Sequence, residues 1–165
     1  MTDPHTVILE MTRIEAGHLA DLVAQFSTLL QDREASVGGA PSDPALARLV
    51  PDAYSDDAEA AREFRDLTET ALLHRRAEDA AIVLASIGAH TTKNAAASDA
   101  RTTHIVRLDP EQLSAWLRTL AALRLVLAIR LGIDDEDDHD EDDPRFGVYD
   151  WLGYRLEGLV HAAEA

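Results

Sequence analysis

The sequence predicts a single, mainly α-helical domain: a bundle of four to five helices with one small two-stranded β element. A length of 165 residues fits one domain at the usual size of about 100–200 residues. Hydrophobic residues make up 46% of the chain and aromatic residues only 5%, so the core must consist of aliphatic side chains and alanine, the best helix former. Several segments also repeat apolar residues at intervals of three and four, which is the helical spacing.

The N-terminal third predicts a strand and two helices. Residues 6–11 are rich in β-branched and apolar side chains, which is typical of a short strand. Thr12 and Glu15 have the spacing of a capping box, and the apolar pattern behind them predicts a helix of roughly five turns. After a loop, Asp43 and Pro44 have the N-cap and first-turn signature of a second, short helix.

The longest helical segment begins at Ser55 or Asp56 and runs to about Ile87, where Gly88 is a stop signal. Its spacing predicts an apolar stripe formed by Phe64, Leu67, Ala71, Ala77, Ala81 and Leu84. We expect this stripe to face the core because one apolar face is what a helix of a globular domain buries.

The second half predicts another strand and two helices. Residues 102–108 form the second strand, which should pair with the first because isolated short strands are marginally stable. Asp109 and Pro110 open a helix that runs to about Leu131 and is apolar on nearly every face beyond its first turns. Such a helix is either central to the core or shared with another subunit. Residues 146–163 predict the last helix.

A dense acidic run separates these two helices. The net charge is −16, and nine of the ten residues from 134 to 143 are acidic. Like charges at this density repel one another, and the run contains no glycine at which a calcium-binding loop could turn. We therefore expect residues 134–143 to form a disordered loop, with weak binding of divalent cations or of a basic partner as the first alternative and a structured site as the second.

Composition and motif content exclude several functions. The acidic charge argues against nucleic acid, whose phosphates require a basic surface. Cysteine is absent, and the seven histidines lack metal-ligand spacing, so we expect no metal and no other cofactor. The sequence shows no export signal and no run of about 18 apolar residues, so we expect a cytoplasmic protein that does not cross the membrane.

Two arginines in the apolar helix form the first candidate site. Arg124 and Arg130 are six residues apart, so at least one should be partly buried and should require a carboxylate. Asp150 and Glu157 on the last helix are the candidate partners. Structural ion pairing is the simpler interpretation, and the functional alternative is a pocket that recognises a carboxylate or a peptide terminus.

Aromatic residues form the second candidate site, an interface that includes Trp116, Trp151 and Tyr154. If Trp151 and Tyr154 lie on one face of the last helix while Tyr149 and Leu152 lie on the other, both faces must be covered. The second face is then covered by another helix or by another chain. This pattern favours a homodimer.

Several blocks of the sequence resemble a known family, and they are residues 45–54, 106–116, 123–127, 130–133 and 148–153. The chain is similar in these blocks to an actinobacterial family of small helical proteins that carries a domain of unknown function. The resemblance implies an intracellular protein whose gene often lies beside that of the Clp protease adaptor for N-degron substrates. Residues 120–123, Leu-Ala-Ala-Leu, depart from the polar Asn-Asp pair that the family tends to have there.

The leading hypothesis is a non-enzymatic intracellular interaction protein, an adaptor or regulator connected through the resemblance to Clp-mediated proteolysis. The sequence has no catalytic constellation, and its apolar helices have more than one face to cover. The first alternative is an enzyme that binds a small molecule or metal in a pocket formed by Arg124 and Asp150. The second alternative is a transcriptional regulator.

Overall fold

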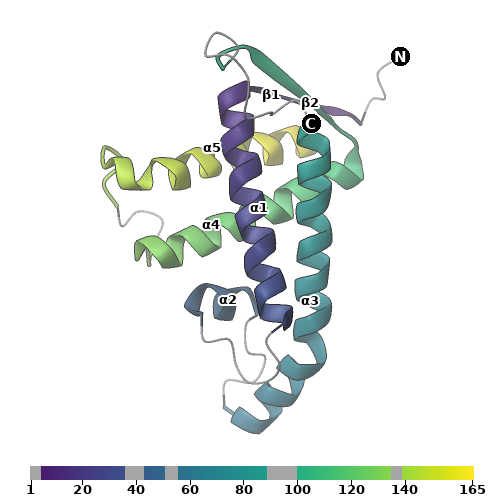
Figure 1. The fold of residues 1–165 in the computed structure, drawn as a ribbon, viewed down its shortest axis with the longest axis vertical. Coiled ribbons are helices and arrows are strands. Elements are labelled where there is room, and N and C mark those ends of the chain that lie inside the picture. The colour runs from purple at the N-terminus through teal and green to yellow at the C-terminus, as the bar shows by residue number, and fades with distance from the viewer. Residues whose placement is uncertain (1–4, 36–42, 51–55, 89–99, 135–138) are drawn as a thin grey trace.

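The computed structural model describes residues 5–35, 43–50, 56–88, 100–134 and 139–165. These residues form five α-helices, two strands and one 3-10 turn (Figure 1). The elements are, in order, β1 (Val7–Thr12), α1 (Arg13–Ala35), α2 (Pro44–Leu49), α3 (Ala58–Ile87), β2 (Thr103–Leu108), α4 (Pro110–Leu131), η1 (Pro144–Phe146) and α5 (Gly147–Glu164). The predicted fold class, a mainly α-helical domain with a small two-stranded sheet, is confirmed.

The two strands pair in antiparallel orientation, with Val7 opposite Leu108 and Thr12 opposite Thr103. Figure 1 shows this sheet across one end of α1 and α3, and β1 leads directly into α1. The backbone N–H of Arg13 also donates to the carbonyl of Thr102 at 3.0 Å, which ties the start of α1 to the segment before β2. The predicted pairing of the two strands is confirmed.

Short polar side chains cap the starts of the first four helices, α1 to α4. The N–H of Thr12 donates to Glu15 at 2.7 Å and the N–H of Glu15 donates to the Thr12 hydroxyl at 3.2 Å, which is the predicted capping box. Asp43 accepts from the N–H of Ala45 at the start of α2. At the end of α4, Gly132 adopts a φ of 71°, a conformation that glycine reaches without steric cost.

The apolar helix α4 is the central one. It packs against α1, α2, α3 and α5, as expected for a helix that is hydrophobic on nearly every face. In Figure 1, α1 and α3 lie side by side, and α4 and α5 cross them. Among the described residues, α4 is also long and apolar enough to cross a membrane by length and composition alone, a test that the core helix of a soluble protein passes too.

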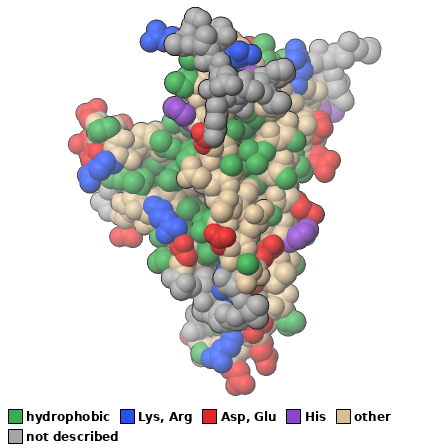
Figure 2. Space-filling view, viewed as in Figure 1, with side chains coloured by type: hydrophobic (Ala, Val, Ile, Leu, Met, Phe, Trp, Pro, Cys, Tyr) green, Lys and Arg blue, Asp and Glu red, His purple; other side chains and the backbone are tan. Residues whose placement is uncertain are grey.

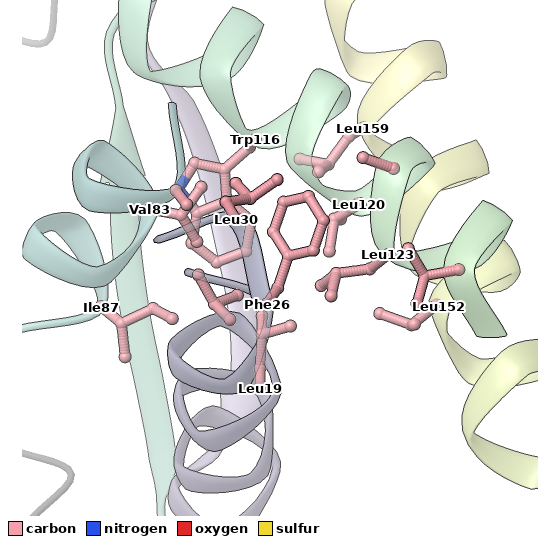
Figure 3. Packing of buried hydrophobic residues seen from close by; sticks show 14 of the residues in the cluster. Leu19, Phe26, Leu30, Val83, Ile87, Trp116, Leu120, Leu123, Leu152 and Leu159 are labelled. Carbon is pink, nitrogen blue, oxygen red and sulfur yellow. The ribbon is translucent and has the colours of Figure 1, made fainter. Parts of the chain in front are cut away.

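Trp116 of α4 lies at the centre of the core and is fully buried. Figure 3 shows it beside Phe26 of α1, Val83 of α3 and Leu120 of α4. Its indole N–H donates to the hydroxyl of Ser86 at 2.7 Å, so its one polar group is satisfied inside the protein. The prediction that Trp116 belongs to an interface is therefore wrong, because α4 is enclosed by the other helices on the side that carries it.

The predicted apolar stripe of α3 is wrong at four of its six positions, because Phe64, Leu67, Ala71 and Ala81 are all exposed. Phe64 is exposed and Leu67 is 81% exposed, whereas Leu73 further along the helix is fully buried. The rotation of α3 is set by long-range contacts, because Glu69 is buried and accepts from Nε of Arg33 on α1 at 2.5 Å. An alanine-rich helix offers several weakly apolar faces, so a buried ion pair can decide which one turns inward.

Candidate functional site: a groove between α1 and α5

A groove of about 500 Å³ opens between α1 and α5. Both helices pack on α4, but α1 packs chiefly against α3 and leaves a gap toward α5. The groove is lined by Glu15, His18, Asp21, Leu22 and Gln25 of α1 and by Gly147, Val148 and Trp151 of α5. We call it the α1/α5 groove. Figure 2 shows hydrophobic side chains gathered on the surface between these two helices.

The groove has an apolar surface that a ligand can reach. Val148 is 47% exposed, and Leu22 and Trp151 are half-buried. Gly147 carries no side chain, and open space surrounds the position that a Cβ would take there. Exposed apolar surface inside a concave site is typical of a place where a ligand or partner binds.

Glu15 is fixed at one end of the groove by four hydrogen bonds. Its Oε2 accepts from the backbone N–H of Thr12 at 2.7 Å and from the hydroxyl of the same residue at 3.0 Å. Its Oε1 accepts from the indole N–H of Trp151 at 2.9 Å and from Nη2 of Arg155 at 3.0 Å. This carboxylate therefore joins the start of α1 to α5 and holds the indole of Trp151 in place.

The same contacts determine the charge of Glu15. Burial by itself raises the pKa of this carboxyl, but the hydrogen bonds from Thr12, Trp151 and Arg155 outweigh burial and lower the pKa to about 2. Glu15 is therefore ionised at neutral pH, and its negative charge is satisfied by donors of the protein itself.

The remaining polar groups of the groove are not engaged in this way. His18, Asp21 and Gln25 are exposed, and none of their side chains forms a hydrogen bond or ion pair within the part of the chain that the structure describes. Asp21 in particular is a carboxylate that a ligand can reach. One groove therefore holds two carboxylates, of which Glu15 is structural and Asp21 is available for binding.

Arg130, a predicted site residue, forms an ion pair elsewhere. Its guanidinium donates two hydrogen bonds to the carboxylate of Asp43, at 3.1 and 2.7 Å. The hydrogen bond from Arg130 holds the pKa of the Asp43 carboxyl below its usual range. Arg130 therefore pairs with Asp43 and not with the predicted partners Asp150 and Glu157. Because Asp43 is the N-cap of α2, this ion pair joins α4 to the start of α2.

Arg124 lies between α4 and α5. Its guanidinium carbon is 4.3 Å from the centroid of the Tyr149 ring, within the range of a cation–π contact. A Cβ at Gly153 would lie 2.9 Å from Nε of Arg124, so the missing side chain at Gly153 makes room for the arginine. Arg124, Asp150 and Glu157 line one open cavity of about 930 Å³, so the structure does bring these three predicted residues together.

Asp150 is also held by the end of the acidic loop. Nε2 of His139 lies 2.6 Å from Oδ1 of Asp150, and the His139 side chain is 5% exposed. The His139 ring also contacts the rings of Phe146 and Tyr149 at centroid distances of 4.8 and 5.5 Å. Residues 135–138 of the predicted disordered loop of residues 134–143 lie outside the described residues, and His139, which follows them, packs against α5.

The aromatic residues of α5 divide between two faces. Tyr149 and Leu152 are buried, Trp151 is half-buried in the groove, and Tyr154 is 70% exposed. Of the three predicted interface residues, Trp151 and Tyr154 therefore remain accessible and Trp116 does not. The structure separates the two accessible ones, because Trp151 faces the α1/α5 groove while Tyr154 lines the cavity beside Arg124.

The groove could not be predicted from the sequence. Glu15, His18, Leu22 and Gln25 repeat at intervals of three and four, which marks a single face of α1 with one apolar and three polar residues. That signal identifies a face but not its surroundings. Nothing local places it opposite the first turns of a helix near the other end of the chain.

A family model, for the domain of unknown function DUF2017, matches residues 1–163. No curated protein and no solved structure matches the chain. The family match covers both helices of the groove and nearly the whole chain, in agreement with the resemblance in the sequence blocks. The family description assigns no activity to the chain.

Proposed function

We propose that this chain, which belongs to the DUF2017 family, is a non-enzymatic interaction protein that binds a segment of a partner protein in the α1/α5 groove. The groove itself is the observation that supports this function. It is concave, partly apolar and built on two helices that pack on the same central helix. Proteins commonly bind an amphipathic helix by laying its apolar face into a groove of this kind.

The state of the ionisable groups supports binding over catalysis at this groove. A general acid or base works best with a pKa near the operating pH, whereas the pKa of Glu15 is about 2. All four hydrogen bonds to Glu15 also come from the protein, and they position Trp151 as a wall of the groove. A positioned, half-buried tryptophan is a typical anchor for a protein partner.

We propose an adaptor or regulator in the cytoplasm whose partner is a component of the Clp protease system. This part rests on the family resemblance. We also propose a homodimer, because Tyr154 and Val160 of α5 expose large apolar side chains outside the groove. Sedimentation equilibrium measures the dimer directly, and a monomer at all concentrations would contradict it.

A retention experiment with matched variants tests the function. Wild-type protein, Val148→Gln and Leu67→Gln are immobilised, and purified Clp components are passed over each. Both substitutions replace an exposed apolar side chain with a good helix former, so all three proteins should fold. We expect the wild type and Leu67→Gln to retain the partner and Val148→Gln to lose it. Equal retention by all three proteins would place the partner outside the groove, and no retention by any would contradict the Clp partnership.

A small-molecule site is the second candidate function, because Arg124, Asp150 and Glu157 line one open cavity. An arginine beside apolar surface can bind a carboxylate through paired hydrogen bonds. Arg124→Met distinguishes this function from a structural role. Loss of binding to small dicarboxylates with an unchanged unfolding midpoint favours the site, whereas unfolding favours a purely structural arginine.

A further inference from the structure

We propose that the α1/α5 groove selects a positively charged amphipathic segment, in which apolar side chains on one face are flanked by a lysine or arginine. This inference rests on the proposed function and specifies the chemistry of the partner. Three properties of the groove carry it: its length, the position of its apolar surface and the balance of charge on its lining.

The length of the groove fits a short helix. The α1 residues that line it extend from Glu15 to Gln25, and ten residues of an α-helix rise about 15 Å. A partner helix of roughly three turns can lie along this distance. Leu22, Val148 and Trp151 provide apolar surface from both walls, so one apolar face of the partner can be buried against them.

The charge of the lining is one-sided. Two carboxylates, Glu15 and Asp21, line the groove, and none of the described lining residues is a lysine or arginine. Glu15 is already paired with Arg155, whereas the Asp21 carboxylate has no hydrogen bond or ion pair within the described residues. A basic side chain of the partner would therefore gain an ion pair with Asp21, while an acidic one would meet like charge.

The charge of the whole chain acts in the same direction. A net charge of −16 on 165 residues attracts a cationic segment over a distance and repels an anionic one. The same repulsion disfavours nucleic acid and anionic membrane surfaces as occupants of the groove. Apolar contact in the groove provides the specificity that this diffuse attraction lacks.

Fluorescence anisotropy with designed peptides tests the inference. The probes are three fluorescein-labelled peptides of about 14 residues, roughly four helical turns. Each has leucines at helical spacing, and all remaining positions are lysine in the first peptide, glutamine in the second and glutamate in the third. Each is titrated with the wild-type protein at about 0.15 M salt, where long-range attraction is largely screened. We expect the lysine peptide to bind at least about tenfold more tightly than the glutamate peptide and more tightly than the glutamine peptide.

Matched variants locate the effect. Asp21→Asn should weaken binding of the lysine peptide about threefold, the size expected of an exposed ion pair, and should leave binding of the glutamine peptide unchanged. Asp66→Asn removes the same charge from an exposed position on α3 and should change nothing. Val148→Gln should weaken both the lysine and the glutamine peptide, because it removes apolar surface that both use.

The outcomes separate the two proposals. If the lysine and glutamine peptides bind equally and both depend on Val148, the groove binds peptides and its selection for positive charge is overturned. If Asp66→Asn weakens the lysine peptide as much as Asp21→Asn does, the attraction is diffuse and the role of the groove in selecting charge is overturned. If Val148→Gln changes no peptide, or if no peptide binds, the proposed docking function fails together with this inference.

Discussion

The two tryptophans of this chain show how different its core and its groove are. Each donates its indole N–H to an oxygen of another helix, Trp116 to Ser86 at 2.7 Å and Trp151 to Glu15 at 2.9 Å. Trp116 is fully buried between α1, α3 and α4, whereas Trp151 is half-buried and lines the α1/α5 groove. The same side chain with the same kind of hydrogen bond therefore has a structural role in one region and is accessible to a partner in the other.

The difference follows from how the helices cover α4. Helices α1 and α3 pack closely against each other and enclose the side of α4 that carries Trp116. Helix α5 also packs on α4 but leaves a groove toward α1. The number of helices that cover a side chain thus decides its contribution to stability, and substitutions in the two regions should have very different costs.

The largest expected effect comes from the core tryptophan. Trp116→Ala should lower the free energy of unfolding by about 3–5 kcal/mol, because it leaves a cavity at a fully buried site. Trp151→Ala should cost roughly 1–2 kcal/mol, because a half-buried side chain loses less buried surface. Urea denaturation measures both values. Equal costs at the two positions would contradict the distinction between core and groove.

The next largest effect concerns the ion pair between Arg33 and Glu69, which joins α1 to α3 where each side chain is 11% exposed. Arg33→Met should lower the free energy of unfolding by about 3 kcal/mol, because it leaves the Glu69 carboxylate buried without its arginine. A cost below about 1 kcal/mol, the range of an exposed pair, would show that the pair does not fix how α3 packs on α1.

A smaller, pH-dependent effect is expected at Glu15, which borders the groove. Its folded-state pKa of about 2 lies below the ordinary value of 4.5, so its contribution to stability is present above pH 4.5 and is lost as the pH falls toward 2. At neutral pH, Glu15→Gln should lower the free energy of unfolding by roughly 1–2 kcal/mol after allowance for partial exposure. The difference in free energy of unfolding between the wild type and Glu15→Gln should disappear between pH 4.5 and 2. A difference that stays constant over this range would contradict an ionised Glu15 that is stabilised by its hydrogen bonds.

The smallest effect is expected at Arg130, which pairs with Asp43 on the surface. Arg130→Met should lower the free energy of unfolding by no more than about 1 kcal/mol, because the arginine is half-exposed and the pair is screened by salt. The cost should shrink further when unfolding is measured at about 1 M salt. A loss as large as that of Arg33→Met would show that the degree of burial does not rank the ion pairs.

The parts of the fold that follow from short-range signals could be predicted from the sequence. Proline after an N-cap aspartate marked the starts of α2 and α4, the capping box at Thr12 marked that of α1, and the even hydrophobicity of α4 identified the central helix. Parts that depend on distant contacts could not be predicted. The carboxylate of Asp43 pairs with Arg130, and that of Glu69 pairs with Arg33.

The candidate site illustrates the same limit more strongly. Glu15 was identified through its spacing from Thr12, but its bonds to Trp151 and Arg155 join residues that are far apart in the chain. No local pattern predicts them. The groove is a space that packing leaves between two helices, so it becomes visible only when the arrangement of α1, α4 and α5 is known.

A thiol footprint tests most directly whether the α1/α5 groove is a binding surface. Because the chain contains no cysteine, Val148→Cys and Leu67→Cys each introduce a unique thiol at an exposed position, one in the groove and one on α3. The rate of maleimide labelling is measured with and without a saturating concentration of the lysine peptide. We expect labelling at position 148 to slow by at least about tenfold and labelling at position 67 to stay unchanged, because reaction requires an accessible thiolate. Unchanged rates at both positions, or equal slowing at both, would contradict the groove as the site of binding.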